Sequence, residues 1–210
     1  MLDLLVSAAV TFFVIVDPLG NVPIFMALTS GRTAAQRRDA AVRAISVAAI
    51  TLVTFGILGN YILEFLGVTI AAFRIAGGVL LLLLAIDMVL ARQSGLRSTT
   101  KPEDREAAHK DDVAVFPLAI PLIAGPGAMT SVLLLLGRVG HDWLGVALVL
   151  GVMLAVLLFN LAAFLSASWL MGRLGVTGVN VIGRVLGIIL AALAIQYVLD
   201  GLAKSFPNLL

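Results

Sequence analysis

Two short runs of proline, glycine and polar residues interrupt the apolar stretches of this 210-residue chain. They are Asp17-Pro18-Leu19-Gly20-Asn21 and Gly125-Pro126-Gly127, with Thr130 following the second. Proline removes a helical hydrogen bond and glycine adds backbone freedom, so each run predicts a break within a helix. Inside a membrane, the backbone groups freed at a break must pair with protein or face a cavity, where they can bind a polar solute. A kink that serves only helix packing is the alternative interpretation.

The residues of these runs suit the two charged ends of a zwitterion. Asp17 is the only acidic residue deep in its apolar stretch, and it could take up a proton, hold an ammonium group or cap the helix that follows. Asn21 could also cap that helix, or line the site with its amide. A helix beginning near Gly127 would direct backbone N–H groups and a positive dipole end at a carboxylate.

Four further polar residues within apolar stretches have both a structural and a functional interpretation: Arg74, Asp87, Asn160 and Arg184. The two arginines lie near the starts of their stretches, where they either extend toward the membrane surface or pair with Asp87 or a substrate carboxylate. Direct pairing of Arg74 with Asp87 is not expected, because about three turns of one helix separate them. Asn160, like Thr130, predicts an interhelical hydrogen bond more readily than a ligand contact.

Several kinds of chemistry lack the residues that they need. The chain has no cysteine, and its two histidines, His109 and His141, fall between the apolar stretches. Neither a phosphate-binding glycine loop nor a serine nucleophile elbow is present in the sequence. We therefore expect no metal, no cofactor and no enzymatic activity.

The elements that must position these residues are membrane-spanning helices. The chain is 61% hydrophobic and 12% charged, which is too apolar for a soluble domain. Stretches long enough to cross a bilayer as helices occur at 2–28, 42–66, 69–91, 113–137, 143–170 and 178–203. Basic residues concentrate in the connections between them, so we expect a lipid bilayer around the chain and no nucleic-acid partner. The polar segment 92–112 predicts an exposed linker.

The distribution of basic residues predicts the orientation of the chain. The connections after the first, third and fifth spans carry Arg32, Arg37, Arg38, Arg43, Arg92, Arg97, Lys101, Arg105, Lys110 and Arg173, and the other side carries Arg138 and Lys204. Cytoplasmic connections are enriched in lysine and arginine. The first set, and the linker with it, is thus expected in the cytoplasm, and both termini outside it.

The two halves of the chain resemble each other. Gly67-Val68-Thr69 recurs as Gly175-Val176-Thr177, and Pro18 recurs as Pro126, each 108 residues later. With one residue inserted, Gly78 aligns with Gly187, Ile86 with Ile195 and Asp87 with Gln196. Three spans per half make the second half enter the membrane from the opposite side, as in many secondary transporters.

The predicted fold is an all-α membrane protein in which the first and fourth of six transmembrane helices are broken. It forms one transmembrane domain, residues 1–210, made of two inverted three-helix repeats. The repeats are residues 1–91 and 113–210, and the cytoplasmic linker 92–112 joins them.

Three segments resemble signatures of the MarC family of integral membrane proteins. They are Asp17-Pro18-Leu19-Gly20-Asn21-Val22-Pro23-Ile24-Phe25, Arg74-Ile75-Ala76-Gly77-Gly78 and Pro117-Leu118-Ala119-Ile120-Pro121-Leu122-Ile123-Ala124-Gly125-Pro126-Gly127-Ala128. The resemblance covers nearly the whole chain. It implies a six-span protein of the bacterial inner membrane, related to the LysE-like transporters, in a family that includes transporters of glycine and alanine.

The sequence and the resemblance together predict a secondary transporter of small neutral amino acids. Alternating access between the inverted halves would move a zwitterionic substrate through a site at the two breaks, with proton coupling through Asp17 as one source of energy. An exporter of drugs or hydrophobic metabolites is the alternative within transport. An intramembrane enzyme and a non-transporting scaffold are alternatives of other classes. Substrate identity, direction, coupling ion and assembly into a homo-oligomer stay open.

Overall fold

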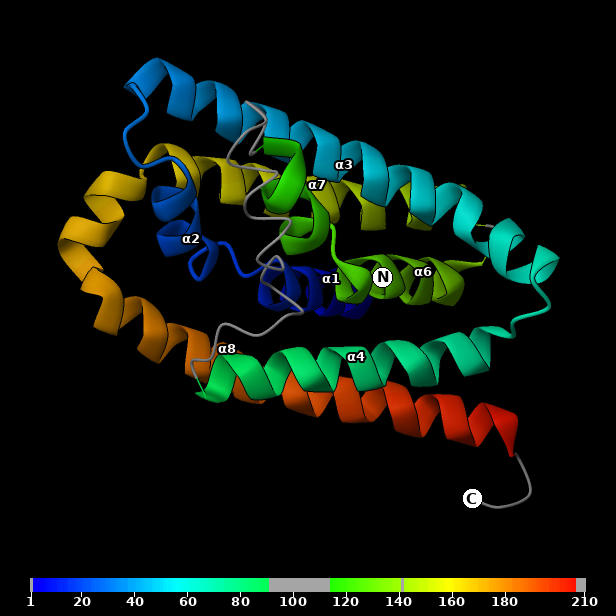
Figure 1. Cartoon of the computed structure of the whole chain (residues 1–210). Helices are drawn as coiled ribbons and strands as arrows, with labels where there is room; N and C mark the ends of the chain where they lie inside the picture. The colour runs from blue at the N-terminus through cyan, green and yellow to red at the C-terminus, as the bar shows by residue number, and fades with distance from the viewer. Residues whose placement is uncertain (1, 91–113, 141, 207–210) are drawn as a thin grey trace.

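A computed structural model describes residues 2–90, 114–140 and 142–206, and these residues are helical with short connections. The helices are α1 (Leu2–Val16), α2 (Asn21–Leu28), α3 (Ala34–Phe65), α4 (Ile70–Leu90), the irregular helical segment η1 (Ala114–Ile123), α6 (Pro126–Val139), α7 (Trp143–Leu165) and α8 (Ala167–Ser205). In Figure 1, α3 runs along one side of the molecule and the α4–α8 pair along the other, with α1 and α6 between them. The predicted linker 92–112 lies outside the described residues.

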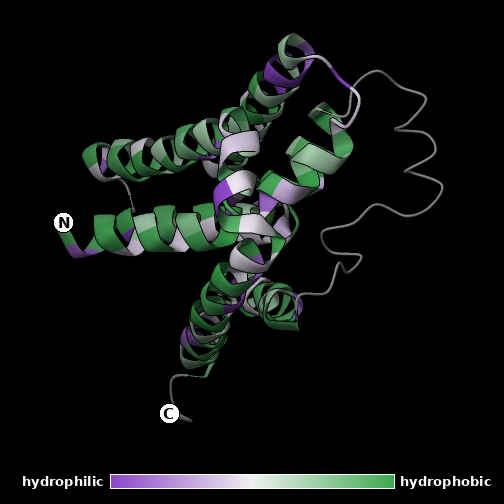
Figure 2. Ribbon diagram, turned by 90° about the vertical axis from the view of Figure 1, so that its left-hand side faces the viewer, coloured by the Kyte–Doolittle hydropathy of each residue, from purple (hydrophilic) through white to green (hydrophobic). Residues whose placement is uncertain are grey.

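Six apolar spans follow from these helices. Five are long and apolar enough to cross a membrane, and η1 with α6, bent by 53° at their junction, makes a sixth. The ribbons are mainly hydrophobic, with only short hydrophilic segments (Figure 2). Large apolar side chains also cover the outside, such as Ile50, Ile188 and Phe65, as a lipid-facing surface requires. The predicted all-α membrane fold with two broken helices is confirmed.

The limits of three spans differ from those predicted; the fifth, predicted to reach residue 170, ends as α7 at Leu165. Helix α3 begins at Ala34, eight residues before the predicted span, because Thr33 and Gln36 form a reciprocal capping box there. Its polar first turns extend the helix beyond its apolar stretch. The last predicted span joins the preceding segment in one long helix, α8, which is interrupted only by a kink at Gly175 with φ 62°.

The kink at Gly175 supports the internal repeat. Its counterpart Gly67, 108 residues earlier, also has a positive φ, 68°, at the turn between α3 and α4. Glycine adopts this conformation without the steric cost that other residues incur. The two Gly-Val-Thr motifs therefore mark the same event in each half, the transition into the third span.

The packing of α4 against α8 also supports the internal repeat, because aligned glycines of the two helices make equivalent contacts. A Cβ atom added at Gly78 would lie 2.7 Å from both the Ala194 carbonyl oxygen and a Val198 methyl. One added at the aligned Gly187 would lie 3.1 Å from the Ala85 carbonyl oxygen and 3.0 Å from a Val89 methyl. Ala194 and Val198 are 109 residues beyond Ala85 and Val89, the same offset that aligns the glycines. Each half thus makes the same contact with the other, as a two-fold axis between antiparallel helices requires.

Candidate solute-binding site

The first helix break lies between α1 and α2. Helix α1 ends at Val16, and Asp17 adopts a positive φ of 47°, which few residues other than glycine do. The Asp17 carboxylate accepts a hydrogen bond from the Gly20 N–H, Oδ1 to N 3.1 Å. A Cβ atom at Gly20 would clash with that carboxylate, so a larger residue there would displace the Asp17 side chain from this hydrogen bond. The predicted role of Asp17 as a cap is therefore present in the structure, although its predicted role in transport is a separate matter.

Asn21 stabilises the same break from the other side. It is fully buried, and its side-chain Nδ2 donates to the Val16 carbonyl oxygen at 2.7 Å. The backbone carbonyls in the turn are also used, since Asp17 O accepts from the Asn21 N–H and Leu19 O from the Val22 N–H. Pro18 and Leu19 contribute the turn itself. The Leu19 carbonyl, one of the backbone groups that a break in the helix was predicted to free, thus already has a backbone donor.

The second break lies between η1 and α6. Both residues that precede a proline in η1, Phe116 and Ile120, have extended backbone angles, as the proline ring that follows favours. Helix α6 then begins with Pro126 directly after Gly125, and no side chain in the described part of the chain caps its first turn. A Cβ atom at Gly125 would clash with the Pro121 carbonyl oxygen. The sharp entry into α6 therefore requires glycine at this position.

Behind this break, Thr130 is used for packing. Its hydroxyl donates to the Pro126 carbonyl oxygen at 2.8 Å, and its side chain occupies the space that a Cβ atom at Gly77 would need. Thr130 therefore joins α6 to α4, and its hydroxyl proton is used within α6.

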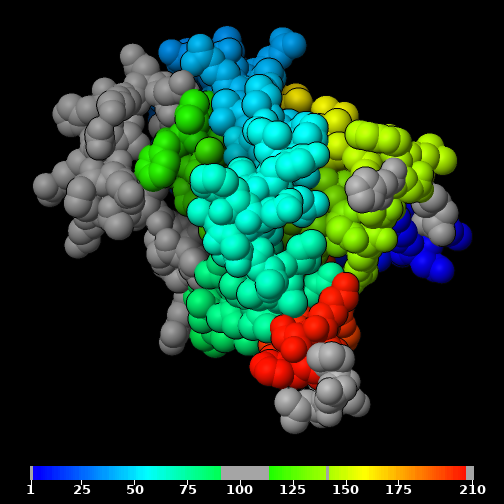
Figure 3. Space-filling model, turned by 90° about the vertical axis from the view of Figure 1, so that its right-hand side faces the viewer, coloured from blue at the N-terminus to red at the C-terminus, as the bar shows by residue number. Residues whose placement is uncertain are grey.

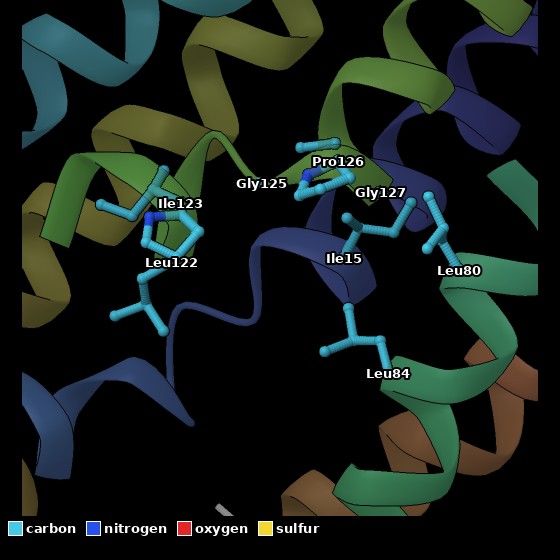
Figure 4. Close-up of a pocket in the computed structure, with 10 residues that line it drawn as sticks. Ile15, Leu80, Leu84, Leu122, Ile123, Gly125, Pro126 and Gly127 are labelled. Carbon is cyan, nitrogen blue, oxygen red and sulfur yellow. The ribbon is translucent and has the colours of Figure 1, made fainter. Parts of the chain in front are cut away.

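A small cavity opens beside the second break. It is lined by the backbone-rich segment Gly125–Ala128, by Pro121–Ile123, by Ile15 at the end of α1, and by Leu80 and Leu84 of α4. Figure 4 shows Ile15 beside Gly127, with Leu80 and Leu84 close by. The cavity volume is about 30 Å³, whereas a cavity of roughly 150 Å³ holds a benzene molecule. In this conformation the cavity therefore has room for only a few water molecules.

Arg74 is buried, and its partner is one that the sequence analysis missed. The side chain is 6% exposed, and Nη1 lies 3.8 Å from Oδ2 of Asp200. Arg138 contacts the same oxygen at 3.7 Å, and Gln196 donates to Asp200 Oδ1 at 2.7 Å. This cluster joins the start of α4 to the ends of α6 and α8. Figure 3 shows the start of α4 beside the end of α8.

The interpretation that Arg74 extends to the membrane surface is therefore replaced by this buried ion pair with Asp200. The available signal was Asp200 itself, an acidic residue inside the last apolar span, one turn after Gln196. Arg184 is exposed on α8, and Asp87 is partly buried on α4; neither joins the two breaks. Asn160 is fully buried on α7.

Comparison with known proteins identifies the family. Residues 2–206 match a family described as "MarC family integral membrane protein". The chain belongs to the MarC family. One similar relative is the UPF0056 membrane protein YvbG of Bacillus subtilis (strain 168), which is 36% identical over 100% of this chain and 99% of its own. Another is the UPF0056 membrane protein YhcE of Escherichia coli (strain K12), which is 38% identical over 94% of this chain and 91% of its own.

A third relative, a UPF0056 membrane protein of Archaeoglobus fulgidus, is 36% identical over 95% of this chain and 92% of its own. No solved structure matches the chain. The resemblance drawn from the sequence motifs is thus confirmed, and this MarC-family chain is a multi-pass integral membrane protein. The names of these relatives describe membrane proteins and specify no transported substance.

Proposed function

We propose that this MarC-family protein is a secondary transporter of small neutral amino acids, of the glycine and alanine class, working by alternating access between its inverted halves. The observation that carries the proposal is the uncapped start of α6, which opens on a cavity at the break repeated in both halves. We place the protein in the bacterial inner membrane, with both termini outside the cytoplasm. The proposed transport involves no cofactor and no enzymatic reaction.

The start of α6 suits a carboxylate. Because the helix begins at Pro126, the N–H groups of Gly127 and Ala128 have no carbonyl one turn back within the helix. Both residues line the cavity. Free N–H groups and the positive end of the helix dipole favour a negatively charged group, here the carboxylate of the substrate.

The remaining walls of the cavity favour a small substrate. They are aliphatic, from Ile15, Leu80 and Leu84, and offer no charged partner to a side chain of the cargo. An amino acid with little or no side chain can bind through its ammonium and carboxylate groups alone. Export of drugs or hydrophobic metabolites would require this cavity to open much further than a substrate of the size of glycine requires.

Uptake into proteoliposomes tests the proposal. The purified protein should take up labelled glycine and alanine, more strongly under an imposed ion gradient, and empty vesicles should not. Leu84→Phe places a larger side chain in the cavity from α4 and should lower uptake roughly 5- to 150-fold, since overpacking costs roughly 1–3 kcal/mol. The matched control is Leu83→Phe, because Leu83 is 45% exposed on the outer face of the same helix.

Two results would count against the proposal. Wild-type vesicles that take up neither amino acid under any gradient contradict amino-acid transport. Equal uptake by Leu84→Phe and Leu83→Phe contradicts the placement of the substrate in this cavity.

A further inference from the structure

Two buried asparagines beside the first break have polar atoms without hydrogen-bond partners among the described residues. They are Asn21, whose Oδ1 is unpaired, and Asn160, whose Oδ1 and Nδ2 are both unpaired. Each side chain is 0% exposed. An unpaired buried amide group costs about 1–3 kcal/mol, and native structures seldom keep such groups unless a ligand or water completes them.

Two aromatic contacts bring these asparagines to the same place. The ring of Phe13 lies 5.5 Å from that of Phe159, and the ring of Phe25 stacks on Phe164 at 4.4 Å. Asn21 lies between Phe13 and Phe25 along the chain, and Asn160 lies between Phe159 and Phe164. The two contacts run in the same order along both segments. Both asparagines therefore lie between the same two aromatic contacts, Phe13–Phe159 and Phe25–Phe164.

The faces of the helices agree with this placement. Asn21 precedes Phe25 by four residues in α2, and Asn160 precedes Phe164 by four residues in α7, so each pair shares one helix face. Asn160 and Phe164 belong to the buried face of α7, and Asn21 and Phe25 to that of α2. Since the two phenylalanines stack, the helix faces that carry the two amides are directed at each other.

The unpaired atoms form a set with a definite chemistry. They are two carbonyl oxygens, which accept hydrogen bonds, and one amide NH₂ group, which donates them. An ammonium group supplies three donors, and a carboxylate accepts from the NH₂ group. Asp17, 1% exposed at the same break, adds a carboxylate to this region. The two amides together, with the Asp17 carboxylate beside them, are complementary to a zwitterion.

We propose that Asn160 and Asn21 form the ammonium-recognition site of the transporter, with the stacked Phe25 and Phe164 covering one side of it. This inference rests on the proposed function and deepens it, because it assigns the amine end of the substrate to side-chain amides in place of freed backbone carbonyls. Selectivity for a primary ammonium group then comes from two neutral oxygen acceptors.

The test compares glycine with glycolate, in which a hydroxyl replaces the ammonium group at almost the same size. The purified wild-type protein in proteoliposomes should prefer glycine in kcat/KM. In Asn160→Leu this preference should fall at least about tenfold, because hydrogen bonds to a charged group contribute roughly 1.5–3 kcal/mol. Without substrate, the unfolding temperature of Asn160→Leu in detergent should equal or exceed that of wild type, since the amide has no protein partner to lose.

Thr29→Val is the matched control. Thr29 is also fully buried, but its hydroxyl donates to the Phe25 carbonyl oxygen at 2.7 Å. This variant should lower the unfolding temperature and keep the preference for glycine. An Asn160→Leu variant that is destabilised like Thr29→Val and still prefers glycine as strongly as wild type overturns the inference, and so does an equal loss of glycine and glycolate transport. A wild-type protein that transports no amino acid overturns the proposed function together with this site.

Discussion

At the scale of single residues, the polar groups at the first break serve the backbone before they serve a solute. Asp17 spends one carboxylate oxygen on the Gly20 N–H, and Asn21 spends its NH₂ group on Val16 O. Asn21 keeps its one side-chain oxygen, Oδ1, without a hydrogen-bond partner among the described residues. Structural and transport roles can therefore coexist in one residue, and substitutions must separate them.

Substitution of Asp17 separates capping from proton coupling. Asp17→Asn keeps an oxygen that can accept from Gly20 and tolerates the positive φ, so the variant should fold. If the carboxylate carries the coupled proton, the variant should still exchange glycine across the membrane but fail to accumulate it under a pH gradient. Asp17→Ala should instead lower stability by about 1 kcal/mol through loss of the cap. Accumulation by Asp17→Asn with an unchanged pH dependence would leave Asp17 a cap only.

The buried ion pair offers a second prediction at this scale. Asp200→Asn removes the negative charge that faces the buried Arg74 side chain. It should lower the free energy of unfolding by about 2 kcal/mol. This is less than the loss expected for a fully buried pair, because the Asp200 side chain is 28% exposed. The double variant Arg74→Gln with Asp200→Asn should recover part of this loss. Unfolding of the four proteins in detergent gives the coupling energy. Additive effects of the two substitutions would show that the pair contributes no stability.

At the scale of helices, the sequence predicted the breaks well and the helix ends poorly. Pro18, Gly125 and Pro126 act on the local backbone, so their effect does not depend on the rest of the fold. The start of α3 at Ala34 was missed because hydropathy reports the membrane-embedded part of a helix and not its polar extension. Asp200 was missed because its partners, Arg74 and Arg138, are distant in sequence and meet only through packing.

Glycines at the α4–α8 interface give an element-scale prediction. Gly187→Leu should force α8 away from α4 and lower the free energy of unfolding by about 1–3 kcal/mol. Gly183→Leu, one turn earlier on the same helix, is the control, because a Cβ atom there meets nothing within 4 Å. Thermal unfolding in detergent compares the two variants. Similar losses in both would indicate a general cost of altering α8 and not close packing at Gly187.

At the scale of the whole molecule, the predicted inverted repeat would link stability to the proposed transport. The α4–α8 contact lies between the halves and is reciprocal, so a rocking motion about it exchanges equivalent contacts. The Arg74–Asp200–Arg138 cluster joins α4, α6 and α8 near the start of α4 and the ends of α6 and α8. If the protein works by alternating access, as proposed, opening at this end must separate or move these charges.

Orientation in the membrane is the final prediction, and it rests on helix lengths as well as on charge. Helix α3 has 32 residues, about 48 Å at 1.5 Å per residue, while the hydrocarbon core measures roughly 30 Å. Its basic first turns must therefore project beyond the bilayer, on the side that the positive-inside rule assigns to the cytoplasm. The chain has no native cysteine, so single introduced cysteines report sidedness without background. In intact cells, a membrane-impermeant maleimide should label Val68→Cys and Ser205→Cys and spare Ser30→Cys and Ser98→Cys until the cells are opened. Labelling of Ser30→Cys and Ser98→Cys alone would reverse the orientation. Labelling of Ser30→Cys together with Val68→Cys would mean that α3 does not cross the membrane, and the pairing of the two halves across it would fail with that helix.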